Sequence, residues 1–350
     1  MKRKFFLILL FAVVLSLILP GFCFAAADAK VLASGVERIY GPTRIETAVQ
    51  LNESYFTDVS DAVLARSDDF PDALAGGVLA YHLRAPMLLT DREILPPNVL
   101  QFLKNHHIRK VYLLGGSYAI TPEVELYLKS EGFTTERLGG ANRFETAMKI
   151  MDKVKNLITP ERLVITIGYD FPDALVSAPY AARRNALMLF VENCMIPPEV
   201  EQYIRSLVQE YPNLTAEIVG GPFVVSDDVK QDLIALLPKK ENGVTRIGGL
   251  NRYETAAAVA EAGEETGIFN RDGVFIATGW NFPDALCAGP IAAFAAEPIL
   301  LTDPNALPTS TKLYLEKSPP FPKAIIVGGP QAVSSTVEET LANYVAAASR

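Results

Sequence analysis

Three arginines at equivalent places of a repeated segment are the residues whose chemistry most needs an explanation. Residues 137–147 read RLGGANRFETA, residues 246–256 read RIGGLNRYETA, and a looser copy, RIYGPTRIETA, occupies residues 38–48. Each arginine is predicted to stand in the first turn of a helix, where a positive charge opposes the helix dipole and costs a few tenths of a kcal/mol. A compensating negative partner is therefore expected for each of them: Arg44, Arg143 and Arg252.

Two kinds of partner would compensate these arginines, and the sequence leaves both open. One is a carboxylate from a neighbouring module. The other is an anionic group of a ligand, because a guanidinium fork beside free helix N–H groups suits a phosphate or a carboxylate. Asn142 and Asn251, directly before two of the arginines, join them as candidate ligand-binding residues.

The rest of the repeated segment has a structural explanation. Asn142 and Glu145 have the spacing of a capping box, in which each side chain satisfies a backbone N–H at the start of a helix. Asn251 with Glu254, and Thr43 with Glu46, repeat that spacing. The glycine pair before the cap fits a tight turn that leaves a strand.

A second motif, Phe-Pro-Asp-Ala-Leu, also occurs three times. Its aspartates stand three residues after Asp69, Asp170 and Asn281, which predicts another N-terminal capping arrangement. The motif also follows the carboxyl end of a predicted strand, which is the edge where open α/β sheets bind ligands. The aspartates are therefore secondary candidates for ligand binding: Asp72, Asp173 and Asp284.

Other kinds of site find little support. His82, His106 and His107 are the only histidines, and none has an equivalent in the other repeats or the spacing of zinc ligands. No serine stands in a Gly-x-Ser-x-Gly elbow, and the Gly-Gly turns lack the dinucleotide and phosphate-loop fingerprints. We therefore predict no catalytic residue, metal or cofactor. A pair of carboxylates acting on glycosides stays open, because such a pair need only meet in space.

The elements that carry these motifs alternate between short strands and helices. In the middle copy, residues 163–167, 186–191 and 218–219 form apolar runs typical of buried strands. Helices are predicted to begin at the prolines of residues 172 and 198 and near residue 226. The same landmarks recur in the other two copies. The predicted fold class is therefore α/β, with three tandem flavodoxin- or Rossmann-like modules built on parallel sheets.

The spacing of the repeated motif predicts the boundaries of the modules. The central arginines are 99 and 109 residues apart, which is the spacing of domains rather than of solenoid repeats. Residues 1–26 are predicted to be a signal peptide, with a lipoprotein linked through Cys23 as the alternative. The predicted modules are residues 27–136, 137–245 and 246–350. Cys194 and Cys287 occupy non-equivalent places, so both thiols are expected to be packing residues.

The net charge and the hydropathy of the chain limit the classes of partner that it could bind. Loss of the three basic residues of the signal peptide takes the formal charge from −8 to −11. A net-acidic chain is not suited to non-specific binding of nucleic acid or an anionic membrane. No apolar run after the signal peptide is long enough to span a bilayer. The mature chain is therefore expected to be an exported protein without a membrane span.

These landmarks in triplicate resemble the cell-wall-binding repeat 2 family of Gram-positive bacteria. The resemblance covers residues 38–350 and implies a pseudo-threefold trimer of modules within one chain. It implies non-covalent retention at the wall by an anionic secondary polymer in grooves between modules. The triplicated arginines and the signal peptide favour a secreted binding protein without enzyme activity of its own. Carried onto this sequence, it assigns polymer contact to the arginines and asparagines of the first motif: Arg44, Arg143, Arg252, Asn142 and Asn251.

The copies also differ, so the three grooves are not expected to be chemically identical. The first copy has Tyr40 and Pro42 where the others have glycine and alanine or leucine. The second copy has Val191 and Glu192 where the others have threonine and aspartate. Alternative functions are a modifier or enhancer of a wall amidase, a structural component of a surface layer, or a wall hydrolase.

Overall fold

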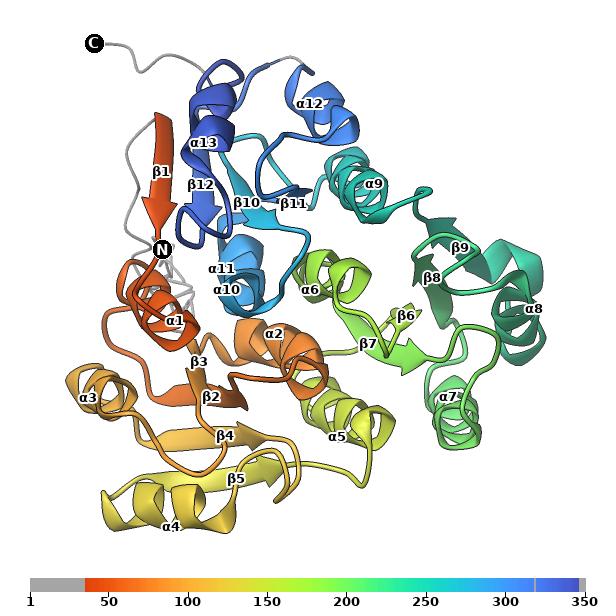
Figure 1. The fold of residues 1–350 in the computed structure, drawn as a ribbon. Coiled ribbons are helices and arrows are strands. Elements are labelled where there is room, and N and C mark those ends of the chain that lie inside the picture. The colour runs from red at the N-terminus through yellow and green to blue at the C-terminus, as the bar shows by residue number, and fades with distance from the viewer. Residues whose placement is uncertain (1–34, 318, 346–350) are drawn as a thin grey trace, which may run out of the picture.

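The fold is taken from a computed structural model, which describes residues 35–317 and 319–345. The predicted signal peptide, including Cys23, lies outside the described residues. Figure 1 shows three sheets arranged around a group of central helices.

Each of the three sheets has four parallel strands, which confirms the predicted fold class. In the order in which the strands pair, the first sheet contains β3 (Met87–Thr90), β2 (Asp61–Arg66), β4 (Lys110–Leu114) and β5 (Thr134–Leu138). The second contains β7 (Ala186–Val191), β6 (Arg162–Ile167), β8 (Thr215–Val219) and β9 (Val244–Ile247). The third contains β11 (Ile299–Thr302), β10 (Val274–Thr278), β12 (Lys323–Val327) and β1 (Gly35–Ile39).

Each sheet takes its last strand from the beginning of the next sequence repeat. The boundaries predicted at 136/137 and 245/246 fall inside β5 and β9, which pair with β4 and β8. The first described strand, β1, pairs with β12 of the third sheet, from Gly35 opposite Lys323 to Ile39 opposite Val327. The repeats therefore form a closed ring, in which β1 and β12 lie side by side (Figure 1).

The helices fall into three groups. The motif helices, which carry the repeated arginines, are α1 (Arg44–Glu53), α5 (Arg143–Lys155) and α9 (Arg252–Glu265). The Phe-Pro-Asp motif begins the central helices α2 (Pro71–Leu83), α6 (Pro172–Arg183) and the pair α10 (Pro283–Leu286) and α11 (Ala288–Ala295). The outer helices are α3 (Pro97–Asn105), α4 (Pro122–Ser130), α7 (Pro198–Glu210), α8 (Asp227–Leu236), α12 (Thr309–Leu315) and α13 (Ser335–Leu341), with a 3₁₀ turn over Lys240–Gly243.

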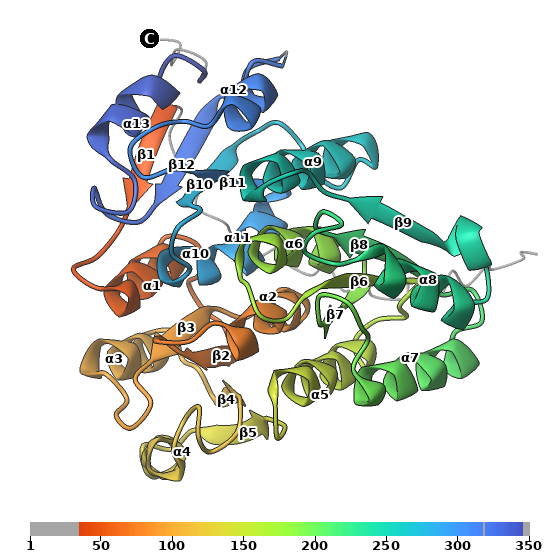
Figure 2. The same cartoon turned by 45° about the vertical axis from the view of Figure 1, so that its right-hand side comes forward.

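The central helices meet around a pseudo-threefold axis. Figure 2 shows α2, α6 and α11 together between the three sheets, and all three are in contact with one another. The phenylalanines of the second motif form a triangle, with ring centroids 6.1 Å apart for Phe70 and Phe171, 5.3 Å for Phe70 and Phe282, and 5.9 Å for Phe171 and Phe282. A Cβ atom at Gly77 would lie 3.3 Å from Cβ of Ala178, so small residues let these helices approach closely.

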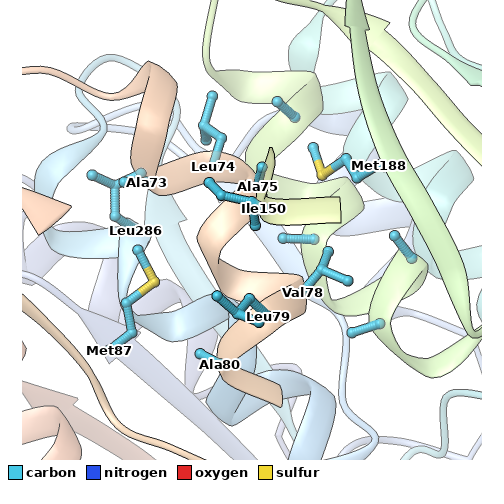
Figure 3. Close-up of a cluster of buried hydrophobic side chains, with 14 of the residues drawn as sticks. Ala73, Leu74, Ala75, Val78, Leu79, Ala80, Met87, Ile150, Met188 and Leu286 are labelled. Carbon is cyan, nitrogen blue, oxygen red and sulfur yellow. The ribbon is translucent and has the colours of Figure 1, made fainter. Parts of the chain in front are cut away.

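One hydrophobic core runs through all three repeats. Figure 3 shows Leu74 and Val78 of α2 near Ile150 of α5 and Met188 of β7, with Leu286 of α10 on the other side. α5 packs both on the second sheet and on α2 of the first repeat, and α9 packs in the same way between β11 and α6. The modules therefore share this core, and a second cluster of buried side chains lies within the third repeat.

The two described cysteines are unlike each other. Cys287 is fully buried at the break between α10 and α11, and burial raises the pKa of its thiol. Cys194 is exposed, and its thiol donates to Oδ1 of Asn193. The packing role predicted for both thiols is therefore wrong for Cys194, because it lies in the loop after β7 rather than on a buried face.

Candidate ligand-binding grooves between the repeats

The motif helices begin with side-chain caps, as predicted. Thr43 accepts from the N–H of Ile45, and Glu46 accepts from the N–H of Thr43 at 3.1 Å, which completes a capping box. Asn142 and Asn251 also cap their helices. Their glutamates instead accept from the N–H one residue earlier, so the reciprocal bond is confirmed only for the first repeat. In the second and third repeats the contacts are Glu145 to Ala141 and Glu254 to Leu250, both 2.8 Å.

Each repeated arginine is anchored to its own sheet. Nη1 of Arg44 donates to the carbonyl of Ser67 at 2.9 Å, and Nη1 of Arg143 donates to that of Gly168 at 2.6 Å. Arg252 makes the equivalent bond to Gly279. These carbonyls follow the carboxyl ends of β2, β6 and β10. A backbone dipole therefore supplies part of the compensation that the helix-start position of each arginine requires.

The arginines also face the preceding repeat. The guanidinium of Arg143 lies 5.9 Å from the ring centroid of Phe70, and that of Arg252 lies 5.7 Å from that of Phe171, distances that allow cation–π attraction. Nη2 of Arg252 is 3.6 Å from Oδ2 of Asp170. The carboxylate partner from a neighbouring module is thus present for Arg252. Among the described residues, no carboxylate oxygen lies within 4.0 Å of Arg44 or Arg143.

The capping role predicted for the second-motif aspartates is wrong. The N-cap residues of the central helices are Phe70, Phe171 and Phe282, without a side-chain cap bond. The residue before each phenylalanine accepts its N–H instead, at 2.9 Å for Asp69, 2.9 Å for Asp170 and 3.0 Å for Asn281. The first residue of the pair therefore makes the local bond, which leaves the second aspartate for a different contact.

The second aspartate has contacts both within its own repeat and to the next one. Asp72, Asp173 and Asp284 point to the glycine turn after the third sequential strand of their sheet, where Gly115, Gly220 and Gly328 have φ of +99°, +125° and +117°. Burial raises the pKa of Asp173 to about 7; nearby Asp170 acts in the same direction, whereas a hydrogen bond from Thr255 of the next repeat opposes the rise. Burial also raises the pKa of Asp72 and Asp284, against hydrogen bonds from Thr146 and Thr47. These carboxyls join adjacent repeats.

Two cavities lie where the carboxyl edge of one sheet faces the motif helix of the next repeat. The third–first groove, of about 560 Å³, is lined by Arg44 and Thr43 on one side and by Asn281, Asp284 and Trp280 on the other. The second–third groove, of about 220 Å³, is lined by Arg252, Asn251 and Thr255 and by Asp170 and Asp173.

The structure thus brings candidate residues of adjacent repeats together. Arg44 and Asp284 share the third–first groove, and Arg252, Asn251 and Asp173 share the second–third groove. Asn142, Arg143 and Asp72 occupy the corresponding places between the first and second repeats, where the amide of Asn142 donates to Glu199 at 3.1 Å.

Exposed apolar side chains beside the grooves were missed by the sequence interpretation. Trp280 and Tyr40 line the third–first groove and are 69% and 45% exposed. Phe223 lines the second–third groove beside Leu250, and both are more than four-fifths exposed, at 84% and 81%. An available signal was their place in the chain, because Tyr40, Leu250 and Trp280 each stand next to a glycine and Phe223 stands two residues after Gly221. Exposure itself cannot be read from a pattern.

Residues 35–317 and 319–345 contain no group of three His, Cys, Asp or Glu side chains placed to hold a metal ion. No helix in the same part of the chain is long and apolar enough to cross a membrane.

A ring of three α/β repeats with ligand-sized grooves at its junctions is the architecture of a binding protein assembled from tandem modules. The chain belongs to the family described as cell wall binding domain 2 (CWB2), which matches it over residues 38–125, 137–230 and 246–338. The suspected family is thereby confirmed, and its description indicates cell wall binding as the general role of the chain.

Relatives place these repeats in larger proteins. The N-acetylmuramoyl-L-alanine amidase LytC of Bacillus subtilis is 28% identical over 312 residues, which are 89% of this chain and 59% of that protein. The amidase enhancer of the same organism is 27% identical over 307 residues, 88% of this chain and 40% of that protein.

Similar solved structures are Cwp8 and Cwp6 from Clostridium difficile. Cwp8 has a TM-score of 0.77 and 26% identity, over 91% of this chain and 52% of Cwp8. Cwp6 has a TM-score of 0.80 and 20% identity, over 91% and 49%. The chain spans about half the length of these relatives.

Proposed function

We propose that this is a secreted, non-enzymatic protein that attaches non-covalently to the Gram-positive wall by binding an anionic secondary wall polymer in the grooves between its repeats. The observation that carries the proposal is the position of Arg44 and Arg252, each of which lines a cavity between two repeats. In each arginine Nη1 donates to a backbone carbonyl, and the other N–H groups of the guanidinium can donate to an anion.

The proposed contacts follow from the same geometry. Arg44, Arg143 and Arg252 bind anionic groups of the polymer, and Asn142 and Asn251 lie beside them at the helix starts. Asp173 is buried and Asp72 and Asp284 are half-buried, all three directed to the glycine turns, so their part is to hold the two walls of each groove in place rather than to meet the polymer directly. The repeats at residues 27–136, 137–245 and 246–350 remain the proposed domains, with residues 1–26 as the export signal.

The test is a pull-down on purified walls before and after chemical removal of anionic polymer. The wild-type chain is expected to bind the intact walls and to lose most of that binding on the stripped walls. Retention should also fall at high salt, since exposed charge interactions are screened within ~10 Å at about 0.1 M salt. Equal retention on both kinds of wall would show that the polymer is not the ligand.

Variants then locate the contacts. Arg44→Gln, Arg143→Gln and Arg252→Gln, singly and together, remove the charges at the grooves. Arg205→Gln is the matched control, because Arg205 is an exposed arginine of the outer helix α7 that pairs with Glu201 at 2.6 Å. The triple variant should lose wall binding while the control keeps it. Unchanged binding by a folded triple variant would assign the arginines to contacts between repeats alone.

A second candidate function is favoured by the similarity to the amidase enhancer: the chain, once on the wall, modifies the activity of a wall amidase. Purified chain added to an amidase acting on walls would raise the rate of cleavage under this alternative. A structural role in a surface layer predicts instead that a stoichiometric partner co-purifies with the wall-bound chain. Clearing of a peptidoglycan gel by the chain alone would indicate the third alternative, a wall hydrolase.

A further inference from the structure

The two cavities differ in the charges that line them. Arg44 is the only basic residue of the third–first groove, and Asp284 is its only acidic one. The second–third groove has Arg252 together with two acids, Asp170 and Asp173. Since Asp284 and Asp173 are equivalent and each is directed to the glycine turn of its own sheet, they do not distinguish the grooves. The difference is the additional carboxylate of Asp170.

Asn281 stands in the third repeat where the first two repeats have Asp69 and Asp170. All three residues use Oδ1 in the same way, to accept the N–H of the following phenylalanine at 2.9 to 3.0 Å. The local structure is therefore the same with an amide or with a carboxylate. What changes is the charge that this side chain presents to the groove.

In the second–third groove that charge already has a partner. Oδ2 of Asp170 is 3.6 Å from Nη2 of Arg252, so an arriving anion must compete with a carboxylate. Between the first and second repeats, Asp69 lies 4.0 Å from Arg66, whose guanidinium is also bound to both oxygens of Asp68. Asp170 is thus within ion-pair distance of the arginine of its groove, whereas Asp69 is held by Arg66 of its own repeat and Arg143 has no carboxylate oxygen within 4.0 Å among the described residues.

The third–first groove lacks such an acid. Asp68, which also acts electrostatically on Arg44, has both oxygens on Arg66 at 2.7 Å. Asp284 is directed to the glycine turn at Gly328 and to Thr47. Arg44 therefore faces a cavity of about 560 Å³, more than twice the volume of the other, without a carboxylate within 4.0 Å in the described part of the chain.

We propose that the third–first groove is the principal anion site of this protein, and that Asn281 makes it so by leaving Arg44 without a competing carboxylate. This inference rests on the proposed function and adds which groove binds and which residue selects it. The ligand group is an oxyanion, either a phosphate or a carboxylate of the polymer. Because β1 of the N-terminal repeat completes this groove beside β12, the principal site forms only when the ring of repeats is closed.

The decisive variant is Asn281→Asp in the full chain. The hydrogen bond to the N–H of Phe282 is kept, as Asp69 and Asp170 demonstrate, so the variant should fold as the wild type does, and its thermal transition provides the check. An added negative charge beside Arg44 should weaken retention on intact walls roughly fivefold or more at low salt, and less at high salt. The matched variant Asp170→Asn removes the acid of the other groove and should change retention by less than about twofold.

The outcomes separate this inference from the proposed function. If wild-type chain binds intact and stripped walls equally, the proposed function fails. If wild-type binding requires the polymer but Asn281→Asp binds as tightly as wild type, the choice of groove is wrong. A large gain by Asp170→Asn without any loss by Asn281→Asp would place the principal site in the second–third groove instead.

Two soluble probes identify the anionic group. Poly(glycerol phosphate) carries phosphates, polygalacturonate carries carboxylates, and uncharged dextran is the control. Binding of one charged probe, weakened by Asn281→Asp, names the source of the oxyanion. A wild-type chain that is retained on walls but binds neither charged probe would contradict an oxyanion ligand.

Discussion

Nη2 of Arg252 lies 3.6 Å from Oδ2 of Asp170, across the junction between the third and second repeats. The side chains of this pair are 34% and 53% exposed. At this junction of the ring, Asp170 therefore compensates part of the positive charge that Arg252 places at a helix start. The pair is in contact with solvent. Its contribution to stability and its effect on ligand binding need not be the same.

Asp170→Asn is expected to change the free energy of unfolding by no more than about 1 kcal/mol, because ion pairs that are this exposed are screened and gain little. Urea denaturation at neutral pH measures the change. A loss well above that size would mean that the junction depends on the carboxylate of Asp170, and the groove would then be a structural contact before it is a binding site.

Asp173 should make stability depend on pH. Its folded-state pKa of about 7 lies above the ordinary value of 3.8, because burial disfavours the charged form. The folded state therefore holds the proton more tightly, so this contribution is complete below pH ~4 and declines as pH rises towards ~7, by an upper bound of about 4 kcal/mol. Arg252 and Asp170 face the same carboxyl and act in opposite directions.

The variant Asp173→Asn isolates that effect, because an amide does not titrate. Its stability relative to wild type should be higher at pH 8 than at pH 4, measured by urea unfolding across that range. Carboxyls whose pKa is lowered, such as those of Asp68 and Glu125, have the opposite dependence in both proteins and cancel in the difference. A constant difference between the two proteins would mean that Asp173 titrates normally.

The glycine turns should be intolerant of a side chain because of the aspartate beneath them. A Cβ atom at Gly115 would lie 2.2 Å from Oδ2 of Asp72, and φ there is +99°. Gly132 has a similar φ of +93°, with no atom within 4 Å of its Cβ position, so Gly132→Ala measures the backbone cost alone, about 1 kcal/mol. Gly115→Ala is expected to cost at least about 1 kcal/mol more. Ala119 also contributes, because its Cβ atom lies 2.5 Å from the same position. Equal losses in thermal or urea unfolding would mean that both neighbours move aside freely.

Closure of the ring should depend on Arg38. This arginine of β1 donates to the carbonyl of Gly328 at 2.8 Å and to the carboxylate of Glu338 in α13 at 2.7 Å, with its side chain only 9% exposed. Arg38→Gln should lower the free energy of unfolding by about 2 kcal/mol, since it leaves the buried carbonyl of Gly328 and the half-buried carboxylate of Glu338 without a charged donor. Lys104→Gln, which breaks the exposed pair with Glu131, is the control and should cost less than about 1 kcal/mol. Similar losses from both variants in urea unfolding would argue that β1 is held by its strand pairing alone.

Most of the local structure follows directly from the sequence. The parallel strands, the proline-led helices and the caps at Thr43, Asn142 and Asn251 are formed where spacing predicted them. These features depend on hydrogen bonds within a few residues and on the period of apolar side chains, and both are visible in a linear chain. The triplication itself indicated the family, since three ordered copies of two motifs are far more specific than either motif alone.

The tertiary structure decided what the motifs contact. The capping prediction for Asp72 failed because Asp69 takes the local bond, and only the packing of the next repeat brings Thr146 to the carboxyl that remains. The exposure of Trp280 and Cys194 was likewise outside the reach of a residue pattern. Sequence by itself determined three capped α/β repeats with an arginine at each helix start. The pairing of β1 with β12, and with it the groove that Arg44 faces, depends on contacts between the two ends of the chain, which no local spacing encodes.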